Sequence, residues 1–124
     1  MAAADNLKKA AHALGAHRIA THPFEGRVRV EHDGEVLADS ERATALEETG
    51  LPTRYYLPRE DVRMELLTPT DTTSHCPFKG DASYYSAPDV ADAFWVYEAP
   101  SEEDAKPIAG LLAPWPGRVE VIVD

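Results

Sequence analysis

The segment RVRVEHDGEVLAD, residues 27–39, alternates apolar and polar side chains on both sides of Asp33-Gly34. Such alternation is typical of a strand with one buried face, and an Asp-Gly pair between two such strands favours a two-residue hairpin turn. In the simplest register, Val30 faces Leu37 across the two strands. The sequence therefore predicts an antiparallel β-hairpin here, with both of these side chains in a core.

More short runs with the composition of strands follow from Arg54 onward. They are rich in β-branched and aromatic residues, are separated by turns with Pro or Gly, and comprise RYYL, VRMELL, ASYYS, AFWVYE and RVEVIV. Together with the hairpin they predict a mainly β domain of seven or eight short antiparallel strands, arranged as a sandwich or a partly open barrel. A chain of 124 residues is long enough to bury one core of this kind.

The N-terminal segment differs from the rest of the chain. Asp5 can cap a short helix that runs to Leu14 and ends at Gly15, and the HPFEG segment that follows is typical of irregular structure. We therefore divide the chain into an N-terminal helix with an irregular lead-in, residues 1–25, and a single mainly β domain, residues 26–124.

Two other segments carry helical signals. SERATALEETG, residues 40–50, begins with a capping residue and ends in glycine, so it predicts either a short helix or a loop with one helical turn. A second helical turn is predicted at Ser101–Ala105, capped by Ser101 and interrupted by Pro107.

The charge balance restricts the classes of partner. The chain has 12 basic and 22 acidic residues, a formal net charge of −10. Such a surface repels phosphate backbones and anionic lipid, so we expect no nucleic-acid or membrane partner. A local basic patch can still hold one small anion, because short-range hydrogen bonds outweigh a screened global field.

The chain contains one cysteine, Cys76, so it cannot form an internal disulfide, which fits a reducing compartment. Its N-terminal segment has no apolar run long enough for a signal peptide, and no segment has the length of a membrane span. We therefore expect a cytoplasmic protein. The sequence does not assign its oligomeric state.

Cys76 lies in the most chemically crowded stretch, SHCPFKGDASYY, residues 74–85. Pro77 favours a turn that brings Lys79 back towards the thiol, and nearby cations stabilise a thiolate. On an extended chain, however, His75 points away from Cys76. The alternative interpretation is a small buried thiol that packs behind the turn, and both interpretations stay open.

Metal binding is not expected from this sequence. A structural zinc site needs about four Cys or His ligands, often in C-x₂-C pairs. Here there is one cysteine, and the five histidines are scattered without helical i, i+4 pairing, at positions 12, 17, 22, 32 and 75. We predict no metal site and no cofactor.

YYLPRED supplies a second candidate group. Pro58 restricts the residue before it to extended geometry, and a tight turn follows. Arg59 can present a planar guanidinium to a carboxylate or phosphate, or it can pair with Asp61 or another carboxylate to brace the fold. Lys79 also has two interpretations, as a group that binds an anion or as a solvated lysine in a turn.

The aromatic runs SYYS and FWVY place neighbouring side chains on opposite faces of a sheet. Tyr84 and Tyr85 therefore face opposite ways, as do Trp95 and Val96. One member of each pair enters the core, and the other lines a pocket or lies on the surface. Tyr and Trp suit pocket walls because they combine apolar area with one hydrogen-bonding group.

Several linked blocks resemble a bacterial and fungal family known as domain of unknown function 427. They are LADS…A…E, YY-P-x-x-D-V, C-P-x-K-G-x-A-x-Y and W-x-Y-x-x-P, and the resemblance covers roughly residues 26 to 124. The ending APWPGRVEV departs from the phenylalanine-tyrosine pair more usual in the family, which affects the local packing around Trp115.

The resemblance implies a compact mainly β fold of tent-like topology, shared with zinc-bearing relatives such as methionine sulfoxide reductase B. The paired cysteines of those relatives are missing from this sequence. The family is sometimes labelled nucleotidyltransferase-like, but the chain shows no pair of metal-binding carboxylates in a G-S-x-x-D-like context. Its recurrent polar and aromatic positions imply a polar-lined cavity, and they include Arg59, Asp61, Cys76, Lys79, Gly80, Tyr84, Trp95 and Tyr97.

These observations give two hypotheses. In the first, the domain has a small-molecule pocket in which Arg59 and Lys79 hold an anionic group, Trp95 and Tyr84 form walls and Cys76 forms the floor. The ligand-binding set then also includes Asp61, His75 and Tyr97, and any catalysis uses Cys76 as the nucleophile with help from Lys79 or His75. In the second, the domain is a non-catalytic structural or protein-interaction module whose motif residues brace the fold. Whether the protein is an enzyme stays open.

Overall fold

The structure is a computed structural model that describes residues 17–124. The helix predicted at Asp5–Leu14 lies outside these residues. Within them there are ten strands, β1 (Ile19–Pro23), β2 (Val28–His32), β3 (Glu35–Ser40), β4 (Thr44–Glu48), β5 (Arg54–Tyr56), β6 (Thr68–Cys76), β7 (Gly80–Ala87), β8 (Val90–Tyr97), β9 (Leu112–Pro114) and β10 (Glu120–Val123). Three short 3₁₀ helices accompany them, η1 (Arg59–Asp61), η2 (Met64–Leu66) and η3 (Glu103–Ile108).

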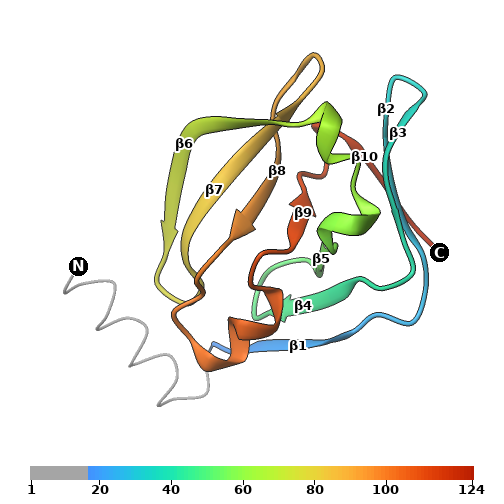
Figure 1. Cartoon of the computed structure of the whole chain (residues 1–124). Coiled ribbons are helices and arrows are strands. Elements are labelled where there is room, and N and C mark those ends of the chain that lie inside the picture. The colour runs from blue at the N-terminus through green and yellow to red at the C-terminus, as the bar shows by residue number, and fades with distance from the viewer. Residues whose placement is uncertain (1–16) are drawn as a thin grey trace.

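The strands form three antiparallel sheets. The first sheet has the order β1-β4-β5, the second β10-β2-β3 and the third β6-β7-β8-β9. In Figure 1 the third sheet stands on the left, the second on the right, and β1 and β4 cross below them. The mainly β prediction is confirmed. The described residues contain more strands than the seven or eight predicted, and their sheets do not close into a barrel.

The hairpin at Asp33-Gly34 is present as predicted. Both turn residues have positive φ, 48° and 81°, the conformation that this dipeptide adopts readily. The predicted register is wrong by one residue, because a bulge between Val30 and Glu31 pairs Val30 with Ala38. Leu37 is the extra residue of the bulge and is still buried.

Residues 40–50 do not form the helix or helical turn predicted for them. Thr44–Glu48 is strand β4, the central strand of the first sheet, between β1 and β5. Strand β1 occupies Ile19–Pro23, where an irregular segment was predicted, and covers one edge of β4. Pairing on both edges and burial of Ala45 and Leu46 outweigh the local helical preference.

Two smaller predictions also need correction. VRMELL is not a strand, since Val62 makes a single bridge to Ala38 and the chain then turns into η2. The helical turn predicted at Ser101–Ala105 is η3, which begins two residues later, includes Pro107 and receives no side-chain cap.

The core consists of two clusters of buried side chains. The larger cluster fills the space between the sheets, and its fully buried members include Val28, Val30 and Phe94. The smaller cluster, around Leu46 and Tyr56, packs beneath the third sheet. Reciprocal backbone hydrogen bonds of 2.8 and 2.9 Å between Leu57 and Leu112 join the end of β5 to β9, and so the first sheet to the third. No helix in the described part of the chain is both long and apolar enough to cross a membrane.

Replacing Gly80 by Ala should destabilise the fold more than replacing Gly117 by Ala. Both glycines have positive φ, +100° and +94°, so alanine at either position should cost about 1 kcal/mol in backbone strain. A Cβ on Gly80 would also lie 3.3 Å from the carbonyl oxygen of Ala99, whereas one on Gly117 meets no atom within 4 Å. Urea unfolding measures both losses, and equal losses would show that residues 99–101 do not pack tightly on this turn.

Candidate functional site

A cavity of about 270 Å³ opens where the first and third sheets meet. Its walls come from β4, β5, β7 and β8, from the β4–β5 loop, from the turn before β7 and from the segment after β9. The lining residues are Leu46, Glu48, Leu51, Pro52, Arg54, Lys79, Tyr84, Trp95, Tyr97, Trp115 and Pro116.

Four aromatic rings form most of its wall. Strand alternation puts Trp95 and Tyr97 of β8 on the cavity side, and Tyr84 of β7 is the pairing partner of Trp95. The rings of Trp95 and Trp115 meet edge to face, with centroids 5.9 Å apart and planes at 85°. Tyr84 lies 5.9 Å from Trp115 at 39°. These are favourable geometries for aromatic contacts, so the rings fix one another in place.

Each tryptophan is also held by a group outside the cavity. The Trp95 indole Nε1–H donates a hydrogen bond of 3.1 Å to the Tyr56 hydroxyl. Burial raises the pKa of Tyr56, so this phenol stays neutral and serves as an acceptor at physiological pH. The Arg118 guanidinium lies 3.7 Å from the centroid of the Trp115 ring, and it donates to the carbonyl oxygens of Ala91 and Asp92 at 3.3 and 3.2 Å.

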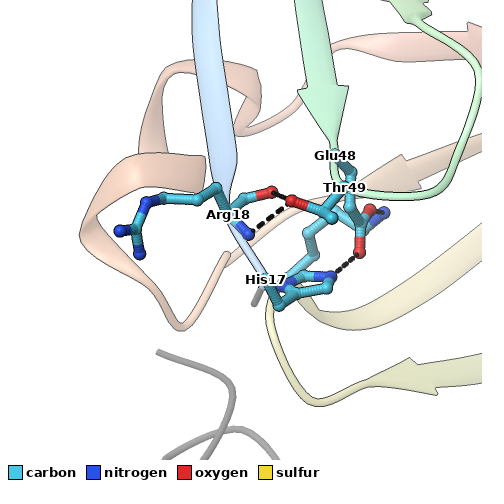
Figure 2. Close-up of polar contacts among 5 residues, drawn as sticks. His17, Arg18, Glu48 and Thr49 are labelled. Carbon is cyan, nitrogen blue, oxygen red and sulfur yellow. Dashed lines mark hydrogen bonds and ion pairs between the residues drawn. The ribbon is translucent and has the colours of Figure 1, made fainter. Parts of the chain in front are cut away.

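A buried ion pair forms the floor. Lys79 Nζ lies 2.7 Å from Glu48 Oε1, and the two residues are 8% and 9% exposed. The other carboxylate oxygen of Glu48 lies 3.0 Å from His17 Nε2, as Figure 2 shows. The ammonium also lies 5.7 Å from the centre of the Tyr97 ring. Burial raises the pKa of the Tyr97 phenol, which therefore faces the cavity in its neutral form.

Arg54 supplies the second positive charge of the cavity. Its guanidinium carbon lies 5.9 Å from the Trp95 ring centroid, and within residues 17–124 no carboxylate lies within ion-pair distance of it. Arg54 and Lys79 together carry two positive charges against the one negative charge of Glu48. The cavity is therefore locally cationic in a chain with a formal net charge of −10.

A family model described as domain of unknown function 427 matches residues 20–124. The chain belongs to this family. No curated protein matches it. The matched region takes in strands β2 to β10 and every residue that lines the cavity, so the aromatic wall and the ion pair lie within the family domain.

Four of the candidate residues from the sequence meet at this cavity of the family domain, namely Lys79, Tyr84, Trp95 and Tyr97. Arg59 does not line it. Its guanidinium donates to Glu98 Oε2 at 2.7 Å, to the Gly110 carbonyl at 3.2 Å and to the Tyr85 hydroxyl at 3.3 Å. Tyr85 faces the opposite side of β7 from Tyr84, so Arg59 braces the other face of the third sheet.

Asp61 and His75 also lie outside the cavity. Asp61 accepts hydrogen bonds from the Ser40 hydroxyl at 2.7 Å and from Arg42 at 2.8 Å, and the bonds from Arg42 lower the pKa of Asp61. This network fixes η1 against the end of β3. His75 is exposed and lies 2.7 Å from the Asp81 carboxylate across the β6–β7 hairpin.

Cys76 does not line the cavity either. It is half-buried and packs against the smaller core cluster. The predicted turn is present, since the Lys79 backbone N–H donates to the Cys76 carbonyl at 3.3 Å. The charged ends of the two expected helpers point elsewhere, that of Lys79 to Glu48 and that of His75 to Asp81. In the described residues no group of three or more His, Cys, Asp or Glu side chains could hold a metal ion.

Three important residues were missed from the sequence. Glu48 was assigned to a helix or loop, so its pairing with Lys79, 31 positions away, had no local signal. Arg54 begins a predicted strand, and the alternation there could have placed its side chain opposite that of Tyr55. Trp115 was noted only as a departure from the family ending. Its proximity to Trp95 results from the pairing of β8 with β9, Trp95 facing Ala113.

Removing one partner of the Lys79–Glu48 pair should lower the free energy of unfolding more than removing both partners. Lys79→Met and Glu48→Leu each leave one buried charge without its main partner, so each should lower the free energy of unfolding by about 3 kcal/mol. The double variant should lose less than either single variant, because neither Lys79 nor Glu48 is then left as a buried charge without its partner. Urea unfolding of the three variants measures this coupling.

The matched control for this cycle is the exposed pair of Arg63 and Glu65, 3.1 Å apart with side chains 49% and 65% exposed. Arg63→Met should cost less than about 0.5 kcal/mol. Additive losses at Lys79 and Glu48 would contradict a coupled pair at the cavity floor.

Proposed function

We propose that this domain binds a small organic molecule that carries an anionic group, and that the cavity lined by Trp95 and Trp115 is the binding site. The observation that carries the proposal is the convergence of four aromatic rings and two cationic side chains on one cavity. Apolar walls with a few convergent polar groups are the usual form of a small-molecule site.

The charge of the cavity supports an anionic ligand. An acidic surface repels anions in general. The concave, aromatic-lined cavity can attract an anion only because specific basic residues give it a local excess of positive charge. Arg54 supplies that excess, because Glu48 balances the charge of Lys79. Arg54 therefore takes the place at the cavity that the sequence had suggested for Arg59.

The rigidity of the walls supports binding as well. Trp95 is fixed by Tyr56, and Trp115 by Arg118, so neither ring has to be ordered when a ligand enters. Binding loses less entropy at a site that is already ordered. The charged networks around Arg59 and Asp61, by contrast, consist of hydrogen bonds that brace the fold.

We propose no reaction at this site, because Cys76 does not line the cavity and its expected helpers contact carboxylates. The proposed setting is the cytoplasm, where a single unpaired and half-buried thiol stays reduced. The proposed partner is a small molecule rather than nucleic acid, in keeping with the overall negative charge.

Intrinsic fluorescence should report ligand binding directly. The chain has two tryptophans and both line the cavity, so a bound molecule should change their emission. We expect a library of acidic, neutral and basic metabolites to give acidic compounds that alter the emission and raise the unfolding temperature. A library in which no compound of any charge does both would contradict the proposal.

A pair of matched variants locates the binding. Leu51 and Val123 are the large hydrophobic side chains exposed on the described part of the chain, and Leu51 alone of the two lines the cavity. Leu51→Glu places a negative charge at the rim and should weaken binding of an acidic compound by about tenfold or more. Val123→Glu makes the same change of net charge elsewhere and should leave binding unchanged. Equal effects of the two substitutions would place the ligand outside the cavity.

A further inference from the structure

The basic side chains of the chain fall into two groups by their partners. Of the twelve Lys and Arg residues, Lys8 and Lys9 lie outside the described residues. Seven of the remaining ten pair with carboxylates, namely Arg27, Arg29, Arg42, Arg59, Arg63, Lys79 and Lys106. Arg18, Arg54 and Arg118 form no ion pair with a carboxylate of residues 17–124. In a chain with almost twice as many acidic as basic residues, an arginine without a carboxylate is an exception that needs a physical reason.

Only one of these three arginines has its guanidinium on the cavity. Arg118 lies against Trp115, its Nη1 donates to two backbone carbonyls, and it does not line the cavity. The Arg18 side chain extends away from Glu48 and Thr49 in Figure 2, and its hydrogen bonds with Thr49 come from its backbone. Arg54 lines the cavity, and its guanidinium carbon lies over the ring of Trp95. Its planar set of N–H donors fits a carboxylate in two-point contact.

The local charge favours an anion with one negative charge. Glu48 lies on the floor of the same cavity, and Lys79 already neutralises it. The charge left for a ligand is therefore the single positive charge of Arg54. A doubly charged phosphate would exceed this charge and would be repelled by Glu48, whereas a carboxylate would balance it.

The shape and lining favour a flat ring. Trp95, Trp115 and Tyr84 form an angular corner of aromatic surface, against which a planar ring can stack or lie edge to face. Arg118 covers one face of Trp115, and the same indole lines the cavity. Leu51, which is 53% exposed, and Pro52 complete the rim with apolar surface. A volume of about 270 Å³ lies near the small end of ligand pockets, which are roughly 300–1,000 Å³, and suits one ring with its substituents.

We propose that the ligand of this cavity is a planar aromatic monocarboxylate, whose carboxylate pairs with Arg54 and whose ring packs in the corner formed by Trp95, Trp115 and Tyr84. This inference rests on the proposed function and names the chemical class of its ligand. Arg54 sets the preference for an acid, and the aromatic corner sets the preference for a flat ring.

Three small molecules separate these two preferences. Benzoate has both the flat ring and the charge, benzamide has the ring without the charge, and cyclohexanecarboxylate has the charge without the flat ring. Their dissociation constants are measured with the whole protein at millimolar concentrations by saturation-transfer NMR and by tryptophan emission. We expect benzoate to bind about tenfold more tightly than either analogue, roughly 1.4 kcal/mol, since each analogue lacks either the charged two-point contact or the aromatic contact.

Variants of Arg54 test whether this residue causes the preference for a negatively charged ligand. Arg54→Gln should remove the preference for benzoate over benzamide, while the preference over cyclohexanecarboxylate persists. Arg54→Lys keeps the charge without the planar donors and should retain part of the preference, which guards against a variant that fails to fold. Arg18→Gln makes the same change of net charge away from the cavity and should leave all three constants unchanged.

Benzamide or cyclohexanecarboxylate binding as well as benzoate, or none of the three binding, would overturn the inference. So would an Arg54→Gln variant that still prefers the acid. These results are distinct from a failure of the proposed function. If the broader library yields compounds of another class that respond to Leu51→Glu and not to Val123→Glu, the cavity is a binding site and the ligand class named here is wrong.

Discussion

The buried ion pair between Lys79 and Glu48 is the contact on which the arrangement around the cavity depends. Glu48 is the last residue of β4 in the first sheet, and Lys79 lies in the turn before β7 of the third sheet. A charged side chain that is buried at either place needs a partner of opposite charge, so the end of β4 and this turn have to meet. The pair thereby ties together two sheets that share no strand, and it closes the floor of the cavity.

The conformation of the turn follows from the same requirement. Gly80, with a φ of +100°, lets the chain reverse directly after Lys79, and the backbone carbonyl of Lys79 accepts from the Ser101 N–H at 3.4 Å. Lys79 is therefore held in place both at its backbone carbonyl and at its ammonium group. Strands β7 and β8 continue from this fixed point, and their alternation carries Tyr84, Trp95 and Tyr97 to the cavity side. The turn at Lys79 and Gly80 thus positions both the ammonium group at the cavity floor and the aromatic rings of β7 and β8.

The sequence predicted the two central strands of the third sheet, β7 and β8, and only β5 of the first sheet, for a physical reason. Strands β7 and β8 have aromatic alternation strong enough to be recognised locally, and the faces assigned to Tyr84 and Trp95 follow from a period of two residues. Strand β4 has Ala, Leu and Glu, which favour a helix in isolation, and it becomes a strand because β1 and β5 pair with both of its edges. Arg59 was expected at the cavity because its residue type suits an anion. Its position on η1, beside Tyr85 and Glu98, depends on how the sheets pack, which no local pattern contains.

The central claim is that ligands bind in the cavity lined by the two tryptophans, and the indole N–H signals of nitrogen-15-labelled protein test it most directly. The chain has two such signals, and that of Trp95 is marked by its hydrogen bond to Tyr56. On titration with an acidic compound found by tryptophan emission, both indole signals and the backbone amide of Leu51 should shift along one saturation curve. The amides of Asp33 and Gly34, at the hairpin tip of the second sheet, should not move. Indole signals that stay in place while amides elsewhere shift would contradict the claim.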